Sequence, residues 1–155
     1  MALDKVYHRI FRPILNDELG SIHNIVNDKR YAMNPSIYTR SFDMIQKDLF
    51  QLFEFIEPAD DNLDTYSLRI NDLLLRICTE IETNFKAILR ENKFSKDLKF
   101  CNVGDYRLIN TSHHLAEYGI TYPVWTGTQN VFVPFKQWNK WDRLFWYDAY
   151  NHCKH

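Results

Sequence analysis

The sequence predicts a mainly α-helical protein, an antiparallel helical bundle with a small β-hairpin inserted before the C-terminal helix. Two stretches, 41–56 and 67–92, repeat apolar residues at the three- and four-residue spacing of amphipathic helices. A third stretch, 120–135, places β-branched and aromatic residues on both sides of a TGTQ turn, which is typical of a hairpin. The 155 residues are 45% hydrophobic and can bury one core, so residues 1–155 are expected to form a single domain.

Composition narrows the class of protein. The formal net charge of -1 argues against coating nucleic acid or an anionic membrane by bulk charge, so a site for a polyanion has to be a local basic patch. The three cysteines lack CxxC spacing, which predicts neither a disulfide framework nor a thiolate zinc site and favours a reducing compartment. No apolar stretch reaches the length of a signal-peptide core or a membrane span. We therefore expect a cytoplasmic protein without a membrane partner.

The N-terminal half is expected to contain three helices. A short one is predicted near residues 13–28. In residues 41–56, apolar side chains recur at helical spacing: Phe42, Ile45, Leu49, Leu52, Phe53 and Ile56. Residues 57–64 then connect to the long helix 67–92, which we expect to lie antiparallel to the second.

The long helix 67–92 has the clearest pattern. Its apolar stripe comprises Ile70, Leu74, Ile77, Cys78, Ile81, Phe85 and Ile88. Asp64, Thr65 and Ser67 are candidate N-caps, since their side chains can accept hydrogen bonds from the first backbone amides. Glu82 falls at the edge of the stripe, so that flank should be polar and half-buried.

The C-terminal half is expected to contain two helices around the hairpin. The stretch 104–119 resembles a helix that stops at Gly119. The last helix should run from about Phe135 to the C-terminus, with five residues on one face: Trp138, Trp141, Phe145, Ala149 and His152. Of these, Trp138, Trp141 and Phe145 are expected to pack on the long helix. Trp146 and Tyr150 would lie on another side, as part of the core, a dimer contact or a stacking surface.

Polar residues gather at the end of this last helix. Leu144, Asp148, Asn151 and His155 share one face because their spacing is i, i+4, i+7 and i+11. The plain interpretation is a solvated helix end, where His155 and Lys154 lie favourably against the terminal carbonyls. A chemical site is the alternative.

The sequence YNHCKH places Asn151 four residues before His155, and the long helix carries the polar pair Glu82 and Lys86 in CTEIETNFKAIL. Together these features resemble the HEPN superfamily of helical-bundle proteins, and within it a bacterial subgroup whose signature is similar to YN-x-x-KH. The resemblance covers most of residues 40–155. It implies an RNA-directed protein, because many HEPN domains are metal-independent endoribonucleases in toxin–antitoxin, abortive-infection and CRISPR systems.

The resemblance also implies roles and partners. His155 would be the acid/base group because the pKa of an unperturbed histidine lies near neutrality. Asn151 would orient the imidazole or contact a phosphate, and Lys154 would supply charge, with Asp148 beside them and Glu82 on the facing helix. HEPN sites are commonly shared between two protomers, so the resemblance implies a homodimer, an antitoxin protein as a further partner, and no cofactor.

The chain departs from the family pattern in two ways, and both bear on whether it is an enzyme. Catalytic members carry an arginine directly before the asparagine, where this chain has Tyr150. A further helix usually follows the histidine, so the resemblance implies a bundle that lacks its final helix after His155. The competing hypothesis is a noncatalytic bundle that dimerises or binds a protein or RNA through its aromatic C-terminal helix.

Other site chemistries rank lower. Asp148, His152 and His155, with His113 and His114 from elsewhere, offer metal ligands but match no zinc or di-iron spacing. Cys153 adjoins His152 in sequence, but neighbouring helical positions point apart, which argues against a nucleophile and base pair. With only 4 glycines and neither GxGxxG nor GxxxxGK[ST], the chain predicts no phosphate-binding loop.

Overall fold

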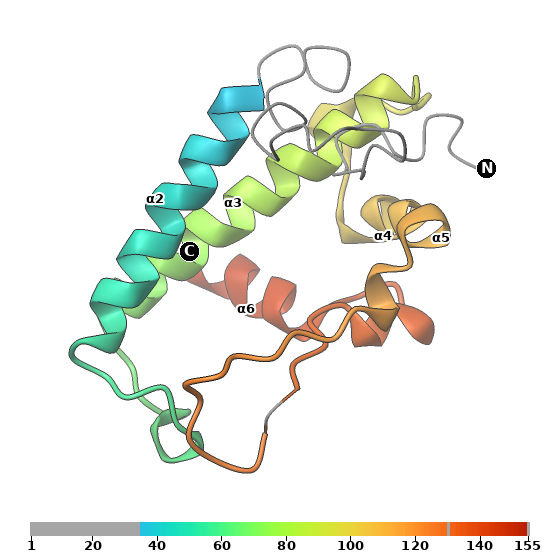
Figure 1. Cartoon of the computed structure of the whole chain (residues 1–155). Helices are drawn as coiled ribbons and strands as arrows, with labels where there is room; N and C mark the ends of the chain where they lie inside the picture. Colours follow the sequence, from blue (N-terminus) through green and yellow to red (C-terminus); the bar gives the residue numbers. More distant parts are fainter. Residues whose placement is uncertain (1–34, 130, 155) are drawn as a thin grey trace, which may run out of the picture.

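The computed structural model describes residues 35–129 and 131–154, and this part of the chain is mainly α-helical (Figure 1). Its α-helices are α2 (Pro35–Phe53), α3 (Leu68–Glu91), α4 (Val103–Tyr106), α5 (Asn110–His113) and α6 (Phe145–Cys153). Single 3-10 turns connect them: η1 (Asp60–Asn62), η2 (Leu98–Phe100), η3 (Arg107–Ile109), η4 (Leu115–Glu117) and η5 (Lys136–Asn139). The mainly α prediction is confirmed for this part of the chain. The helix expected near residues 13–28 lies outside the described residues.

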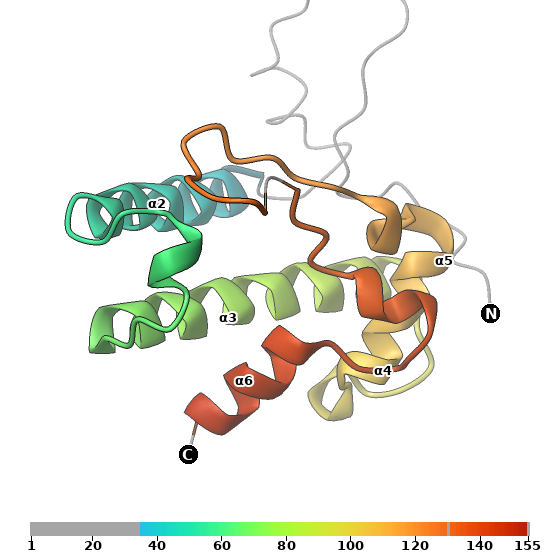
Figure 2. The ribbon, with the colours of Figure 1, turned by 90° about the horizontal axis from the view of Figure 1, so that it is seen from below.

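Helix α3 is the central element. It matches the predicted helix within one residue at each end, and Ser67 is its N-cap, whose hydroxyl accepts a hydrogen bond from the Ile70 amide. Helix α2 runs antiparallel to α3 (Figure 1), and Figure 2 shows α3 between α2 on one side and α6 on the other. Among the helices of the described part, none is both long and apolar enough to cross a membrane.

The core lies on the α6 side of α3. Its buried members come from α3, the α4–α5 segment, η4, η5, and α6 with the residue before it: Cys78, Phe85, Ile88, Leu89, Tyr106, Ile109, Ala116, Trp138, Leu144, Tyr147 and Tyr150. Phe85 is in the centre of an aromatic cluster, with ring centroids 5.5 Å from Tyr106, 5.9 Å from Phe135 and 5.8 Å from Trp138. These large rings fix where η5 and α6 pack on α3.

Helix α2 is attached differently. Of its described side chains, none is fully buried, and it begins six residues earlier and ends three residues earlier than the predicted 41–56. Ser41 donates a hydrogen bond to Glu80 of α3 over 2.7 Å, and Asp48 forms an ion pair with Arg76. Polar contacts therefore supplement a shallow apolar contact between α2 and α3.

The predicted hairpin is wrong in form. Within residues 35–129 and 131–154 there is no β-strand, and the two segments meet only at an antiparallel bridge between Ile120 and Phe132, with N–O distances of 2.7 and 2.8 Å. The hairpin does not extend because its turn segment forms backbone hydrogen bonds with another loop. The Thr126 amide donates to the Pro58 carbonyl over 2.8 Å, and its carbonyl accepts from the Asp60 amide, so it pairs with the α2–α3 loop instead of extending the hairpin.

The helix predicted over 104–119 is broken. Residues 104–113 lie in α4, η3 and α5 in succession, and then His114 adopts a left-handed conformation with φ of 52°. The stop therefore comes five residues before Gly119. A left-handed residue ends a helix by turning the next amide away from the helical carbonyls.

The last helix is also shorter than expected, because it begins at Phe145 and not near Phe135. In a continuous helix the Trp138 carbonyl would accept the amide of the residue four positions later. Here that carbonyl accepts a hydrogen bond from Arg107 Nε over 3.0 Å, and the Arg107 guanidinium also pairs with Asp142. Arg107 thus holds the chain in a turn between η5 and α6, and this break changes which residues α6 buries.

Asp60 joins the α2–α3 loop to the loop before η5. Its carboxylate accepts hydrogen bonds from Trp125 Nε1 over 2.8 Å, from the Thr128 amide over 2.7 Å and from the Thr128 hydroxyl over 2.8 Å. Gly127 packs directly beneath it, with φ of 150°, and a Cβ at Gly127 would lie 2.3 Å from Asp60 Cγ. Only glycine fits this close approach.

Asp60→Asn is expected to destabilise the protein at neutral pH. The Trp125 and Thr128 hydrogen bonds lower the pKa of Asp60 from 3.8 to about 2, so the folded state prefers the carboxylate. This contribution is present above the ordinary pKa of 3.8 and is lost as the pH falls towards 2. Urea unfolding followed at several pH values should show a lower midpoint for Asp60→Asn at neutral pH and a shrinking difference in acid. The exposed neighbour variant Asp61→Asn is the control, and equal midpoints for wild type and Asp60→Asn at neutral pH would contradict the prediction.

Candidate functional site

The end of α6 is held on α3 by two buried tyrosines. The Tyr147 hydroxyl donates a hydrogen bond to the Glu82 carboxylate, whose other oxygen lies 3.8 Å from Lys86 Nζ. The Tyr150 hydroxyl lies 3.4 Å from Thr79 Oγ1. Burial, followed by the adjacent Glu82, raises the pKa of Tyr147, so its phenol stays protonated and remains the donor.

The predicted site residues fall into two groups. Tyr150 is only 4% exposed and belongs to the core, and Glu82 faces Tyr147 and Lys86 at the half-buried flank expected from the sequence. Asn151 and Lys154 are exposed at the end of α6. Tyr150 and Glu82 therefore help to hold α6 against α3, whereas Asn151 and Lys154 face solvent.

Lys154 connects the two groups. Its Nζ lies 3.6 Å from the centroid of the Tyr150 ring and 3.5 Å from Asn151 Oδ1. An ammonium ion over the face of an aromatic ring is attracted by the ring quadrupole, so the buried tyrosine positions the lysine. An amide and an ammonium group are thereby kept next to each other on the surface.

The remaining predicted residues are Asp148 and His155. Asp148 is half-buried and accepts two hydrogen bonds from Arg143, over 3.0 Å from Nε and 2.6 Å from Nη2. Both hydrogen bonds converge on Oδ2, so the Arg143 guanidinium holds this oxygen in a charge-assisted pair. His155 lies outside the described residues.

Sequence reasoning missed Arg143 at this site and named His152 only as a possible metal ligand. Arg143 provides a guanidinium five residues before Asp148, although the sequence analysis found no arginine in the motif itself. His152 is exposed, and its Nδ1 lies 2.7 Å from the Asp148 carbonyl oxygen. A carbonyl can only accept, so Nδ1 is the donor, and in the neutral imidazole Nε2 is then the acceptor. The signal that could have found His152 is its position next to Asn151, on the face that α6 leaves exposed.

The expected orientation of the last helix is wrong. The sequence placed Trp138, Trp141 and Phe145 on one face packed on the long helix, but Trp138 is 1% exposed whereas Trp141 and Phe145 are 50% and 54% exposed. The break before α6 separates Trp138 from the other two. The buried face of α6 is instead formed by Tyr147 and Tyr150, with Trp146 packed against the core and its Nε1 donating to the Pro134 carbonyl over 2.9 Å.

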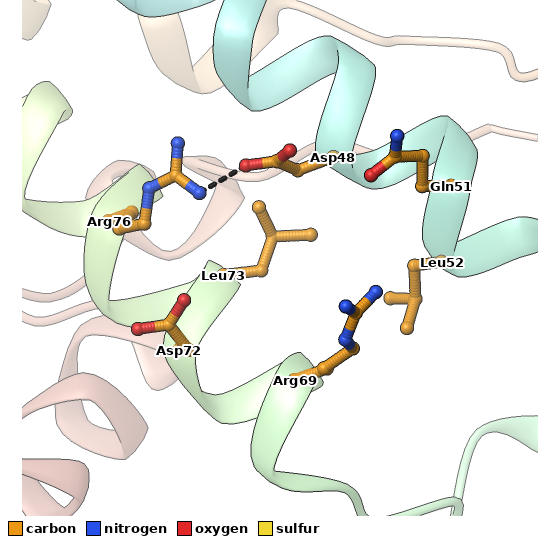
Figure 3. A pocket seen from close by; sticks show the side chains of 7 residues that line it. All are labelled: Asp48, Gln51, Leu52, Arg69, Asp72, Leu73 and Arg76. Atoms are coloured by element: carbon orange, nitrogen blue, oxygen red, sulfur yellow. Dashed lines mark hydrogen bonds and ion pairs between the residues drawn. The ribbon is translucent and has the colours of Figure 1, made fainter.

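A separate pocket of about 180 Å³ lies between α2 and α3 (Figure 3). It is lined by Asp48, Gln51, Leu52, Arg69, Asp72, Leu73 and Arg76. The ion pair between Asp48 and Arg76 closes one side, while Arg69 points from α3 towards α2. Two arginines balance two aspartates, so the pocket has no net charge with which to select an anion or a cation.

Metal ligands do not gather in the part of the chain that the structure describes: no three histidine, cysteine, aspartate or glutamate side chains are placed to share an ion. The three cysteines are free, as the sequence predicted, and burial raises the pKa of Cys78 to about 11. We compared the chain with protein-family models, with curated proteins and with solved structures, and no match was found in any of the three.

Proposed function

We propose that this chain is an RNA-directed, HEPN-like protein and that the end of α6 is its site, with metal-independent RNA cleavage as the candidate activity. The observation that supports this proposal is the exposed group at the end of α6, where Asn151 and Lys154 lie 3.5 Å apart and His152 is the next residue after the asparagine. An amide, an ammonium ion and an imidazole are the polar groups that bind phosphate and transfer protons near neutral pH.

Cleavage without a metal needs three functions at this site. The 2′-oxygen attacks the adjacent phosphorus while a base takes its proton, and the bond to the 5′-oxygen breaks as an acid protonates the leaving oxygen. The products are a 2′,3′-cyclic phosphate and a 5′-hydroxyl. In our proposal His155 and His152 are the acid/base candidates, and Asn151 and Lys154 stabilise the charge on the phosphoryl oxygens.

Glu82 and Tyr150 have a positioning role in this proposal. The Lys154 ammonium lies over the Tyr150 ring. Glu82 accepts a hydrogen bond from Tyr147 and thereby fixes the preceding turn of α6. We further propose that two protomers face each other across α6, so that the groups of both contribute to one site in a homodimer. An antitoxin protein would then be the partner that covers this surface.

A second candidate function is a noncatalytic module that dimerises or binds a protein or RNA. The observation that favours it is the environment of Tyr150, which occupies the position of the arginine in catalytic HEPN proteins and is buried among Cys78, Tyr106 and Tyr147. A buried phenol cannot supply the permanent charge that an arginine gives to a transition state. Arg143 is the basic residue nearest to this role, but Asp148 neutralises it.

Incubation of the full chain with labelled single-stranded RNA in EDTA tests the enzyme hypothesis. Asn151→Ala, His152→Ala and His155→Ala are compared with His114→Ala and Asn139→Ala, which change exposed residues of the same types on other elements. Loss of a proton-transfer group should slow cleavage by roughly 10²- to 10⁴-fold, and the product should end in a 2′,3′-cyclic phosphate. Cleavage that survives in all three α6 variants contradicts the proposed site. RNA binding without cleavage by the wild-type protein identifies the noncatalytic module.

A further inference from the structure

Two exposed aromatic rings form a pair immediately before and at the start of α6. Trp141 is 50% exposed and Phe145 is 54% exposed, and their ring centroids are 6.0 Å apart with an interplanar angle of 34°. The neighbouring Trp138 and Trp146 pack in or against the core. Rings of this size expose apolar surface that no segment within residues 35–129 and 131–154 covers, so the pair is a candidate contact surface.

The ring pair continues as a stripe along α6. Phe145, Ala149 and His152 are spaced i, i+4 and i+7, which places them on one face, and all three are exposed. At a rise of about 1.5 Å per residue, His152 lies roughly 10 Å along the helix from Phe145. Ala149 lies between Phe145 and His152 on this face and has only a methyl side chain, so it does not obstruct a strand that runs from the aromatic rings to the imidazole.

Three basic residues lie close to the ring pair in the sequence: Lys136, Lys140 and Arg143. Lys136 and Lys140 are exposed and form no ion pair with any residue in the described ranges. The Arg143 guanidinium lies 5.6 Å from the Phe145 ring centroid. The nearby carboxylates of Asp142 and Asp148 are paired with Arg107 and Arg143, so the two lysines remain as uncompensated charge.

We propose that single-stranded RNA binds along this stripe, with bases stacked on Trp141 and Phe145, phosphates near Lys136 and Lys140, and the strand directed along α6 to His152. Aromatic faces beside cations are the usual means of holding a single strand, because every base has a face that can stack. Trp, Phe and Arg are common in protein–protein contacts as well, whereas Lys is depleted there, so the two lysines are what favours RNA over a protein as the occupant. This inference rests on the proposed function and extends it by naming where the RNA is held.

The test is a binding measurement in which cleavage cannot occur. A fluorescein-labelled 2′-O-methyl oligoadenylate lacks the attacking hydroxyl, so its anisotropy reports binding alone. Trp141→Ala and Phe145→Ala should each weaken binding by roughly 5- to 100-fold, and Trp141→Phe should retain most of the affinity because a ring remains. Phe55→Ala, which removes a 78% exposed ring at the end of α2, should leave affinity unchanged.

Salt dependence tests the basic part of the surface. Lys140→Gln should reduce the slope of log affinity against log salt by about 0.7, because one fewer phosphate contact releases counterions. Lys47→Gln, which changes an exposed lysine on α2, is the matched control and should leave the slope unchanged.

The outcomes separate this inference from the proposed function. If the wild-type protein binds and cleaves RNA and the two alanine variants bind like wild type, the stripe is wrong while the function stands. If the wild-type protein does not bind the oligonucleotide or RNA, both are wrong. If Trp141→Ala converts a dimer to a monomer in sedimentation without changing RNA affinity, the surface is a contact between copies of the chain and the inference is overturned.

Discussion

Trp138→Ala is expected to lower the free energy of unfolding by about 3–5 kcal/mol, the range for truncating a buried aromatic residue. Trp141→Ala is expected to change it by no more than about 0.5 kcal/mol, as is usual for an exposed site. The two tryptophans are three residues apart, yet one is 1% and the other 50% exposed. Comparing the unfolding free energies of the two variants shows which of the two tryptophans packs in the core at η5.

The size of the Trp138 effect follows from its contacts. Its ring centroid is 4.9 Å from that of Phe135 and 5.8 Å from that of Phe85, so it joins η5 to the middle of α3. Its indole N–H makes no hydrogen bond within the described residues. The side chain therefore stabilises the fold by apolar packing, and Trp138→Phe should be milder than Trp138→Ala because part of the ring contact remains.

Urea unfolding, followed by far-ultraviolet circular dichroism, gives these free energies. Circular dichroism is preferable to tryptophan fluorescence here because the substitutions remove a fluorophore. A loss for Trp141→Ala equal to that for Trp138→Ala would contradict the observed break between η5 and α6, since it would mean that both rings pack on α3.

The sequence was sufficient to predict α3 because its stripe is long and local. Apolar residues repeat over about five turns, and Ser67 provides a cap at the expected boundary. The position of Glu82 at a half-buried polar edge follows from the same periodicity and is confirmed by its ion pair with Lys86. Periodicity predicts which side chains share a face as long as the helix is continuous.

Elements decided by distant contacts could not be predicted in the same way. The hairpin pattern in 120–135 is present, but Thr126 pairs with the loop after α2, far away in the sequence. The register of the last helix depends on Arg107, whose guanidinium takes the Trp138 carbonyl and pairs with Asp142. No local pattern contains these partners, so continuous helical numbering placed Trp141 and Phe145 on the wrong side.

The sequence predicted only part of the candidate site, again because distant contacts decide which face of α6 is buried. Asn151 and Lys154 lie together and exposed, as a polar helix end requires, while Tyr150 is in the core because the buried face of α6 is shifted from the predicted one. His152 becomes an acid/base candidate only in the folded helix, where its Nδ1 donates to the Asp148 carbonyl. Tautomer and exposure are properties of the folded helix and not of the motif.

Tyr150→Ala is expected to cost about 3–5 kcal/mol of unfolding free energy, while Tyr150→Phe should cost no more than about 1.5 kcal/mol. The ring is buried, whereas the hydroxyl makes only a long contact of 3.4 Å to Thr79. Tyr150→Arg, which introduces the arginine that the proposed HEPN resemblance expects at this position, should be as harmful as Tyr150→Ala because it places a charge in the core cluster that includes Cys78, Tyr106 and Tyr147. Thermal and urea unfolding of the three variants measure these differences.

The same variants separate a structural from a chemical role for Tyr150. If this tyrosine acts by supporting Lys154, then Tyr150→Phe keeps the ring under the ammonium and should keep RNA binding and any cleavage, because the ring face attracts the cation without the hydroxyl. A Tyr150→Phe protein that folds like wild type but loses activity would instead assign the phenol to the reaction. In the proposed HEPN-like function Tyr150 stands at the arginine position, and its burial in the core explains why an arginine cannot simply replace it.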